Sequence, residues 1–364
     1  MGPLAEYRII ELGGLGPAPM CGMLLADLGA EVILVERSGE AEIGAKPTDT
    51  IERRGKRSIE LDLKDARSIE ILLKLAETSD GLIEGFRPGV TERLGLGPND
   101  CLACNPKLVY GRVTGWGQDG PLAQTAGHDI NYIALSGALH AIGPKDGPPL
   151  PPLNLVGDYG GGALYLACGM LAGLLEAQKS GQGQVIDAAM LDGVLYQMSL
   201  YFTLGAAGRW QEERGSNHLD GGAPFYRTYE TQDGKYLSIG ALEQKFYDEL
   251  LQKLEIKSDD LPDRLDPANW PTLTATFEEV FKSKSLADWR NLLEGTNTCF
   301  APVLPLSDAA SHPHIKARAA ITDTAGYAQP SPGPRFSRSN LAAPTRPEEK
   351  GASTAEILAE LGIS

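Results

Sequence analysis

The sequence lacks several features that would place the protein in a membrane or outside the cell. No apolar run reaches about 18 residues, which argues against a transmembrane helix. The N-terminus, MGPLAEYRIIELGG, has neither the charged start nor the long apolar stretch of a signal peptide. The five cysteines are an odd number, and Cys101 and Cys104 form a lone CxxC without nearby histidines. We therefore expect reduced thiols and a cytoplasmic protein that does not bind membranes.

Metal-ligand patterns and a positive overall charge are also missing. His312 and His314 lie two residues apart and would face apart on a helix, so no metal site is expected. The formal net charge of −15 argues against nucleic acid as a partner. In GGLGPAP, Gly14 and Gly16 are followed by Pro19 at the third position of a dinucleotide-binding turn. We expect a tight strand-to-helix turn there and no redox cofactor.

One segment departs from this acidic average. Residues 51–64, IERRGKRSIELDLK, are rich in arginine and lysine around a predicted strand, KRSIELDL. A solvated charged turn explains such a cluster, and so does a cationic patch that captures a small polyanion. The basic residues of the segment are Arg53, Arg54, Lys56, Arg57 and Lys64.

Apolar strand patterns alternate with helical patterns in the first half of the chain. The strands are predicted in YRIIEL, EVILVER, KRSIELDL, DGLIEGF, KLVYGRVTG and VIDAAM. Strands that alternate with helices form a parallel sheet with crossover helices. We expect an α/β fold with a Rossmann-like, doubly wound large domain over residues 1–190, completed by the C-terminal segment 332–364.

The pattern changes near residue 225. YRTYET and KYLSIG, joined by QDG, predict a β-hairpin, and three helical patterns and the short strand CFAPVLPL follow. We expect a small α+β domain over residues 225–312. A linker over 191–224, with a helix from Leu191 to about Leu204, and a return linker over 313–331 would connect it to the large domain.

Six stretches together resemble the family III CoA transferases, in order and across nearly the whole chain. They are ELGGLGPAPMCGMLLADLGAEVILVER, RRGKRSIELDLK, EGFRPGVTERLGLG, VTGWGQDGP, AGHDINYIALSG and LVGDYGGGALYLACGMLAGL. GHDINY and ALEQKFY at 241–247 match the α-methylacyl-CoA racemase branch of that family. The resemblance implies an acyl-CoA substrate, a large and a small domain, and an interlocked homodimer, with no cofactor beyond the CoA of the substrate.

The resemblance also implies which residues invert the carbon α to the thioester carbonyl. Inversion needs a base on one face of this carbon and an acid on the other. By resemblance, His128 in GHDINY is one acid/base and Asp158 in LVGDYGGG is the other. The backbone N–H of Asp129 is a candidate donor to the thioester oxygen, because helix starts carry unpaired donors. Glu243 would orient His128 and favour its protonated form, reaching it across the dimer interface.

CoA binding is assigned by the same resemblance. Arginine matches phosphate geometry with a planar fork of donors, whereas lysine offers a point charge. Arg93 could instead pair with Glu92 or Glu84, and an aromatic side chain at Tyr132 could simply pack. The implied binding residues are Arg37, Arg54, Leu61, Lys64, Arg87, Arg93 and Tyr132.

Each catalytic candidate also has a purely structural interpretation. Asp158 and Asp129 both precede helical patterns and would serve as N-caps. His128 is typical of a helix start, and Glu243 suits the first turn of the helix after KYLSIGA. A helix start also favours the carboxylate form of Asp158, although one direction of the reaction needs its neutral acid.

Two other functions are compatible with parts of the sequence. A CoA transferase would use Asp158 as a nucleophile and pass through a mixed anhydride, but that mechanism needs neither His128 nor Glu243. A non-catalytic acyl-CoA binding protein would keep the basic segment and need no acid/base. We expect the racemase, and the sequence leaves open whether its acyl group is a steroid side chain, a branched fatty acyl or an aryl-propionyl group.

Overall fold

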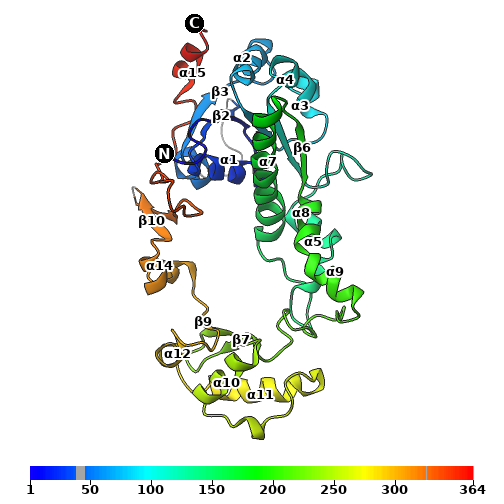
Figure 1. The fold of residues 1–364 in the computed structure, drawn as a ribbon, viewed down its shortest axis with the longest axis vertical. Helices are drawn as coiled ribbons and strands as arrows, with labels where there is room; N and C mark the ends of the chain where they lie inside the picture. Colours follow the sequence, from blue (N-terminus) through cyan, green and yellow to red (C-terminus); the bar gives the residue numbers. More distant parts are fainter. Residues whose placement is uncertain (38–45, 325, 364) are drawn as a thin grey trace. The chain divides into compact units, whose positions relative to one another are not determined.

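The computed structural model describes residues 1–37, 46–324 and 326–363, drawn in Figure 1. The chain forms two compact units. Unit 1 consists of Met1–Ser136, Leu153–Met198 and Ala317–Ser364, and unit 2 of Gly137–Pro152 and Ser199–Lys316.

Unit 1 is built on a six-stranded sheet in the order β3-β2-β1-β4-β5-β6. All of its strand pairs are parallel, which confirms the predicted doubly wound α/β fold. The strand order reverses between β1 and β4, and doubly wound proteins bind ligands at the carboxyl ends of the strands where this reversal occurs. The strands are β1 (Arg8–Leu12), β2 (Glu31–Glu36), β3 (Lys56–Glu60), β4 (Gly81–Glu84), β5 (Val109–Thr114) and β6 (Val185–Ala189).

Helices cover both faces of this sheet (Figure 1). They are α1 (Pro17–Asp27), α2 (Ala66–Glu77), α4 (Pro98–Cys104), α7 (Leu164–Ser180) and α15 (Thr354–Glu360). Ile9 of β1 packs in a core with α1 and α7, whereas the next residue, Ile10, packs in a second core with α2, α4 and α15. Because both faces are buried, the strands read as continuous apolar runs in the sequence.

The segment before α7 is a π-helix, η3 (Leu155–Ala163), a rare form that often occurs at functional sites. Together, η3 and α7 form one helix, Leu155–Ser180, that is long and apolar enough to cross a membrane by length and composition. In the sequence, Asp158 and Glu176 limit the uncharged part of this stretch to residues 159–175, so it stays below a run of about 18 apolar residues. Half of its most apolar window is buried, and α7 packs on the sheet, as expected of a core helix.

Shorter elements complete unit 1, and α5 and α8 both pack against η3. Strands β10 and β11 pair as an antiparallel hairpin that the sequence pattern did not predict. These elements are η1 (Pro47–Asp49), η2 (Ile51–Arg53), α3 (Val90–Leu94), α5 (Asp129–Leu135), α8 (Met190–Gln197), β10 (Ile321–Thr324) and β11 (Tyr327–Pro330).

Unit 2 is the predicted α+β unit, with a three-stranded antiparallel sheet in the order β7-β8-β9. Strands β7 (Tyr226–Glu230) and β8 (Tyr236–Gly240) form the expected hairpin, and β9 (Phe300–Pro302) adds to β8. An aromatic core that includes Phe225 and Trp289 joins the sheet to its helices. The helices and 3-10 turns are α6 (Ala138–Ala141), α9 (Ser199–Ala206), α10 (Gln244–Lys253), η4 (Ser258–Asp260), η5 (Pro267–Asn269), α11 (Trp270–Phe281), α12 (Leu286–Leu293), α13 (Leu306–Ala309) and α14 (Pro313–Ala317).

The units differ from the expected domains on both sides of η3. Residues 137–152 belong to unit 2, where the Arg214 guanidinium donates to the carbonyl oxygens of His140, Pro144 and Gly147. The expected linker helix is two helices, and α8 belongs to unit 1 because it packs on η3. A local hydropathy pattern cannot predict such contacts between residues that are far apart in the sequence.

The expected return linker over 313–331 is also wrong in part. From Ala317 onward the chain belongs to unit 1 and forms the β10–β11 hairpin. The Arg54 guanidinium donates to the Gln329 side chain and to the carbonyl oxygen of Pro330. This arginine therefore ties the returning chain to the large unit.

Candidate active site

The glycine-rich turn after β1 lies beside η3. Gly16 adopts a φ of 75°, in the left-handed region that favours glycine. A Cβ at this position would lie 3.4 Å from Oδ2 of Asp158. The GGLGPAP turn therefore leaves room beside the Asp158 carboxyl group, and Pro17 then starts α1.

Asp158 lies inside η3 rather than at its start. The N-cap residue is Asn154, so the interpretation of Asp158 as an N-cap is wrong. The half-buried Asp158 carboxyl accepts a hydrogen bond from Nδ2 of Asn154 at 3.4 Å. Burial raises the pKa of Asp158 and is the largest effect. The hydrogen bond from Asn154 lowers it, the charge of Asp129 raises it by less than Asn154 lowers it, and His128 has the smallest, lowering effect. The carboxyl group thus binds its proton more tightly than an exposed aspartate.

His128 is the N-cap residue of α5, as its structural interpretation predicts, but its imidazole does not serve as the cap. Asn131 Oδ1 accepts the backbone N–H of His128 at 3.0 Å, and the Asn131 N–H donates to the His128 carbonyl at 2.8 Å. Because Asn131 makes the capping hydrogen bonds at the start of the helix, the exposed His128 side chain is not needed for capping and can act as an acid/base.

Asp129 is buried and does not cap its own helix, which corrects that interpretation. Its Oδ2 accepts the backbone N–H of Asp158 at 2.8 Å. A Cβ at Gly157 would lie 2.8 Å from Cγ of Asp129, so only glycine permits this contact. The Asp129 carboxylate therefore joins α5 to η3 and brings His128 and Asp158 into one neighbourhood.

Tyr132 packs in the core of unit 1, only 6% exposed, with its ring edge-on to Trp116 at a centroid distance of 4.8 Å. Its ring lies against the backbone of Gly127, where a Cβ would come within 2.7 Å of it. Burial raises the pKa of Tyr132, as do Asp158 and Asp129, while Arg87 lowers it. Tyr132 therefore lies beside the acidic pair and within electrostatic reach of Arg87.

Four of the expected CoA-binding cations are exposed at loops or helices that follow strands of unit 1. Arg37 follows β2, Lys64 follows β3 and Arg87 follows β4, while Arg93 lies in α3. These positions are open to solvent at the carboxyl edge of the sheet, where a polyanion could reach them. Leu61, by contrast, is 6% exposed and packs in the second core, so its side chain is not offered to a ligand.

Arg54 differs most from its expected role. Its side chain is 2% exposed and pairs with Asp27 at 2.5 Å. Nη1 donates to Gln329 at 2.8 Å and to the Pro330 carbonyl at 2.7 Å. The guanidinium thus uses its donors inside the protein and is not available to a phosphate in this arrangement.

The other basic residues near Arg54 are also committed to the fold. Lys56 pairs with Glu11 at 2.5 Å and donates to the Pro19 carbonyl at 2.9 Å, with both charges buried. Arg53 pairs with Glu36, and Arg57 pairs with acidic residues of β2 and α15. The cationic cluster at 51–64 is therefore mainly a set of ion pairs, and Lys64 is its exposed member.

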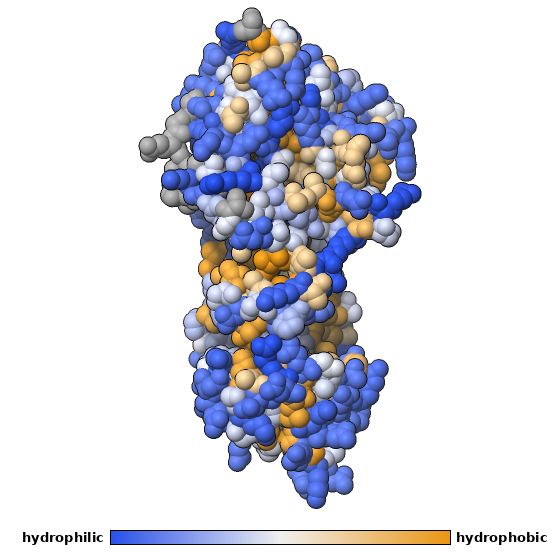
Figure 2. All heavy atoms as spheres, turned by 90° about the vertical axis from the view of Figure 1, so that its left-hand side faces the viewer, coloured by the Kyte–Doolittle hydropathy of each residue, from blue (hydrophilic) through white to orange (hydrophobic). Residues whose placement is uncertain are grey.

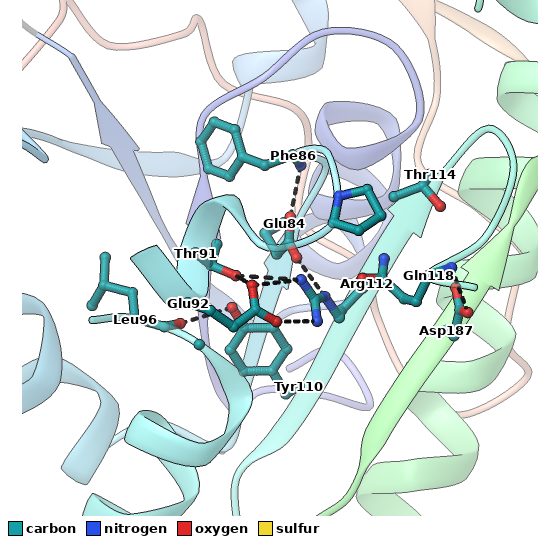
Figure 3. Close-up of polar contacts among 12 residues, drawn as sticks. Glu84, Phe86, Thr91, Glu92, Leu96, Tyr110, Arg112, Thr114, Gln118 and Asp187 are labelled. Carbon is teal, nitrogen blue, oxygen red and sulfur yellow. Dashed lines mark hydrogen bonds and ion pairs between the residues drawn. The ribbon is translucent and has the colours of Figure 1, made fainter. Parts of the chain in front are cut away.

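Ion pairs of the buried Arg112 hold the segment that carries Arg87 (Figure 3). Arg112 of β5 donates through Nε to Glu84 at 2.8 Å and through Nη1 to Glu92 at 2.7 Å. Glu84 also accepts the backbone N–H of Phe86 at 2.6 Å. Within the described residues, both Glu84 and Glu92 form their ion pairs with Arg112. This contradicts the alternative in which Arg93 pairs with either of them.

A second contact in Figure 3 anchors the loop that leads from β5 to His128. Asp187 of β6 accepts the backbone N–H of Gln118 at 2.9 Å. Sequence reasoning missed Asp187, Arg112 and Glu84 as supports of the site. In the sequence, each of these residues could have been recognised as a charged residue inside an apolar strand, because a charge at such a position needs a buried partner.

Glu243 lies in unit 2, where it is the exposed N-cap residue of α10 rather than a first-turn residue. Its side chain makes no capping hydrogen bond. Its charge contributes to a raised pKa of Cys299, after the larger effect of burial. The support of His128 by Glu243 stays a prediction.

The described residues contain neither a group of metal ligands nor a disulfide. Across the three described ranges, no group of three or more His, Cys, Asp or Glu side chains is arranged to hold a metal ion. All five cysteines are free thiols, and Cys101 is buried.

Comparison with known proteins gives the family of the chain. CoA-transferase family III matches residues 4–351. The α-methylacyl-CoA racemases of Mus musculus and Homo sapiens are 44% and 42% identical to the chain, each over 99% of it and 94% of the relative. The succinyl-CoA:glutarate CoA-transferase of Homo sapiens is 29% identical over 99% of the chain and 86% of that protein. The crystal structure of a CAIB/BAIF family protein from Brucella suis has a TM-score of 0.84 and 27% identity, over 99% of both chains. The chain therefore belongs to CoA-transferase family III.

Proposed function

We propose that this protein is an α-methylacyl-CoA racemase that inverts the α-carbon of 2-methylacyl-CoA thioesters. The observation that carries the proposal is the neighbourhood of His128 and Asp158, two groups able to transfer protons, joined through Asp129 at the carboxyl edge of the sheet. The identity of 44% and 42% to two racemases supports it.

The proposed mechanism uses one acid/base on each face of the substrate. For one epimer His128 removes the α-proton and neutral Asp158 returns a proton to the opposite face, and for the other epimer the roles exchange. The backbone N–H of Asp129, at the start of α5, is the proposed donor to the enolate oxygen between the two transfers. Burial, which raises the pKa of Asp158, favours the neutral acid that this cycle needs.

CoA binding in this proposal relies on the exposed cations at the carboxyl edge of the sheet. Arg37, Lys64, Arg87 and Arg93 would contact the nucleotide and its phosphates. Arg54, Leu61 and Tyr132 would support the same region from inside the protein. We propose no cofactor beyond the CoA of the substrate, and no nucleic acid or membrane partner.

We also propose that the protein is a cytoplasmic homodimer. Figure 2 shows hydrophobic patches on a surface that is otherwise mostly hydrophilic. Large apolar side chains are exposed on α7 and α8 of unit 1 and, separately, on α9 of unit 2, and exposed apolar surface is typical of an interaction site. They include Leu164, Leu175, Tyr196, Leu200 and Phe202. In such a dimer Glu243 would support His128.

The test is solvent exchange at the α-carbon. Either epimer of a 2-methylacyl-CoA, incubated with the enzyme in D₂O, should give both epimers with deuterium at the α-carbon. A CoA transferase would leave this carbon untouched, would need a free carboxylic acid as acceptor, and would form an acyl adduct on Asp158 that hydroxylamine traps. Movement of CoA to added acid without α-exchange would refute the racemase.

Variants assign the two faces. His128→Ala and Asp158→Ala should each abolish most inversion, because one face then lacks its acid/base. Exchange without inversion in one variant would show which face the remaining residue serves. His314→Ala, at an exposed histidine of unit 2, is the matched control and should keep full activity.

A further inference from the structure

The proposed cycle requires a proton on Asp158 in one direction, yet this residue lies in the first turn of η3. A helix start favours the carboxylate over the neutral acid. Burial opposes that effect, but Asp158 is only half-buried. A second structural feature is therefore expected to hold the proton.

The Asp129 carboxylate has the required position. Oδ2 is 2.8 Å from the backbone nitrogen of Asp158, and the side chain is buried between α5 and η3. Oδ1 is also buried, and no hydrogen-bond partner is recorded for it within the described residues. A buried carboxylate with a single hydrogen bond keeps a strong field, because little solvent or counter-charge screens it.

The surrounding backbone is adapted to this contact. Gly157 lacks the Cβ that would meet Cγ of Asp129 at 2.8 Å, so the chain just before Asp158 approaches Asp129 as closely as a glycine allows. At Gly16 a Cβ would lie 3.4 Å from Oδ2 of Asp158, an ordinary contact distance, so the turn after β1 borders the carboxyl group without crowding it. The close approach is therefore the one between Gly157 and Asp129.

We propose that the Asp129 side chain is a positioning residue for Asp158, which fixes the backbone of this acid and, through its negative charge, retains the proton that Asp158 returns to the enolate. The inference rests on the proposed racemase function and adds to it. The backbone N–H of Asp129 would contact the substrate, whereas its side chain acts only through Asp158.

Other groups around Asp158 act in both directions. His128 on α5 and Asn154 on η3 favour its carboxylate form, while Asp129 favours the neutral form. The phenol of Tyr132 lies nearby, and Tyr159 donates to Glu52 of η2 at 3.1 Å. Of these groups, Asp129 is the one whose charge opposes ionisation of Asp158 and whose side chain also bonds to its backbone. The groups to consider are His128, Asp129 and Tyr132 on α5, Arg87 after β4, Glu52 on η2, and Asn154 and Tyr159 on η3.

The test is direct titration of Asp158 in Asp129→Asn, which keeps an oxygen for the Asp158 N–H but removes the charge. The Cγ signal of Asp158 is followed by ¹³C NMR in protein with labelled aspartate, and is identified by its absence in Asp158→Asn. We expect the midpoint to fall by about one pH unit, the order of shift expected when a nearby like charge is removed. Asp119→Asn, which removes an exposed charge between β5 and α5, should leave the midpoint in place.

Activity gives a second measurement. The kcat/KM of both epimers should fall about tenfold and to the same extent, because one pKa unit is a tenfold change in protonation and the equilibrium between epimers fixes their ratio. The acid limb of the pH profile should move down with the NMR midpoint. Asp129→Ser, another neutral acceptor, serves if Asp129→Asn does not fold.

The outcomes separate this inference from the proposed function. An unchanged Asp158 midpoint in a folded neutral variant overturns the role of Asp129, even if the wild type racemises its substrate. A lowered midpoint supports the electrostatic coupling. Absence of α-exchange in the wild type, by contrast, would defeat the racemase and leave that coupling measurable.

Discussion

Replacement of Arg54 by alanine is expected to lower the free energy of unfolding, and not to weaken CoA binding directly. The change removes the ion pair with Asp27 at 2.5 Å and the bonds to Gln329 and the Pro330 carbonyl. Asp27 has 8% of its side chain exposed and would be left as a buried, unpaired carboxylate. Breaking such a pair costs about 3–5 kcal/mol, so Arg54→Ala should lose roughly this much free energy of unfolding.

Urea unfolding followed by circular dichroism and by tryptophan fluorescence measures this loss. The double variant Arg54→Met with Asp27→Leu removes both charges and should recover most of the stability, because no unpaired charge remains buried. Substrate saturation of the folded fraction should give a KM within about twofold of the wild type.

The opposite pattern would refute this reasoning. If Arg54→Ala lost less than about 1 kcal/mol, the size of a surface ion pair, while the KM rose more than tenfold, the guanidinium would bind CoA and the arrangement with Asp27 would not persist in the enzyme. A double variant no more stable than Arg54→Ala would show that the hairpin contacts, not the charge on Asp27, carry the cost.

Three further predictions concern the cations, the buried pair and unit 2. Arg87→Ala should raise the KM roughly 10- to 100-fold, as for loss of one hydrogen bond to a charged group, with kcat and urea stability unchanged; an unaltered KM removes Arg87 from the site. Burial raises the pKa of Glu11 to about 7 in the folded state, so the free energy of unfolding falls as the pH rises from the pKa of Glu11 in the unfolded chain toward about 7. Lys56→Met should make this fall steeper between pH 5 and 8. Equal pH dependence of the free energy of unfolding in the variant and the wild type, measured with urea, would contradict this. Glu243→Gln should lower kcat roughly 10- to 100-fold, as for loss of an orienting partner. The exposed control Glu255→Gln should not change kcat. Full activity in Glu243→Gln would show that Glu243 is only the N-cap residue of α10.

The elements of both units were predictable because they depend on local patterns. The alternation of apolar strands and helices predicted the parallel sheet, and the QDG turn between alternating runs predicted the β7–β8 hairpin. The break between α8 and α9 and the β10–β11 hairpin were not predicted. Their boundaries depend on packing against η3 and on contacts with Arg54, which lie far away in the sequence.

The amino-acid sequence by itself determined the fold class, because the alternation of strands and helices follows from local periodicity. The resemblance of contiguous motifs to a known family gave the family and pointed to His128 and Asp158 as the residues to examine. Only the tertiary structure decided what the charged residues do. Arg54 belongs to a cationic run in the sequence, yet its partner is Asp27, at the end of α1 and 27 residues earlier in the chain. Asp129 reads as a helix cap, yet its carboxylate reaches Asp158 on another element. The charge of a side chain is local information, whereas the partner that neutralises it, or the acid whose pKa it raises, is set by how distant segments pack.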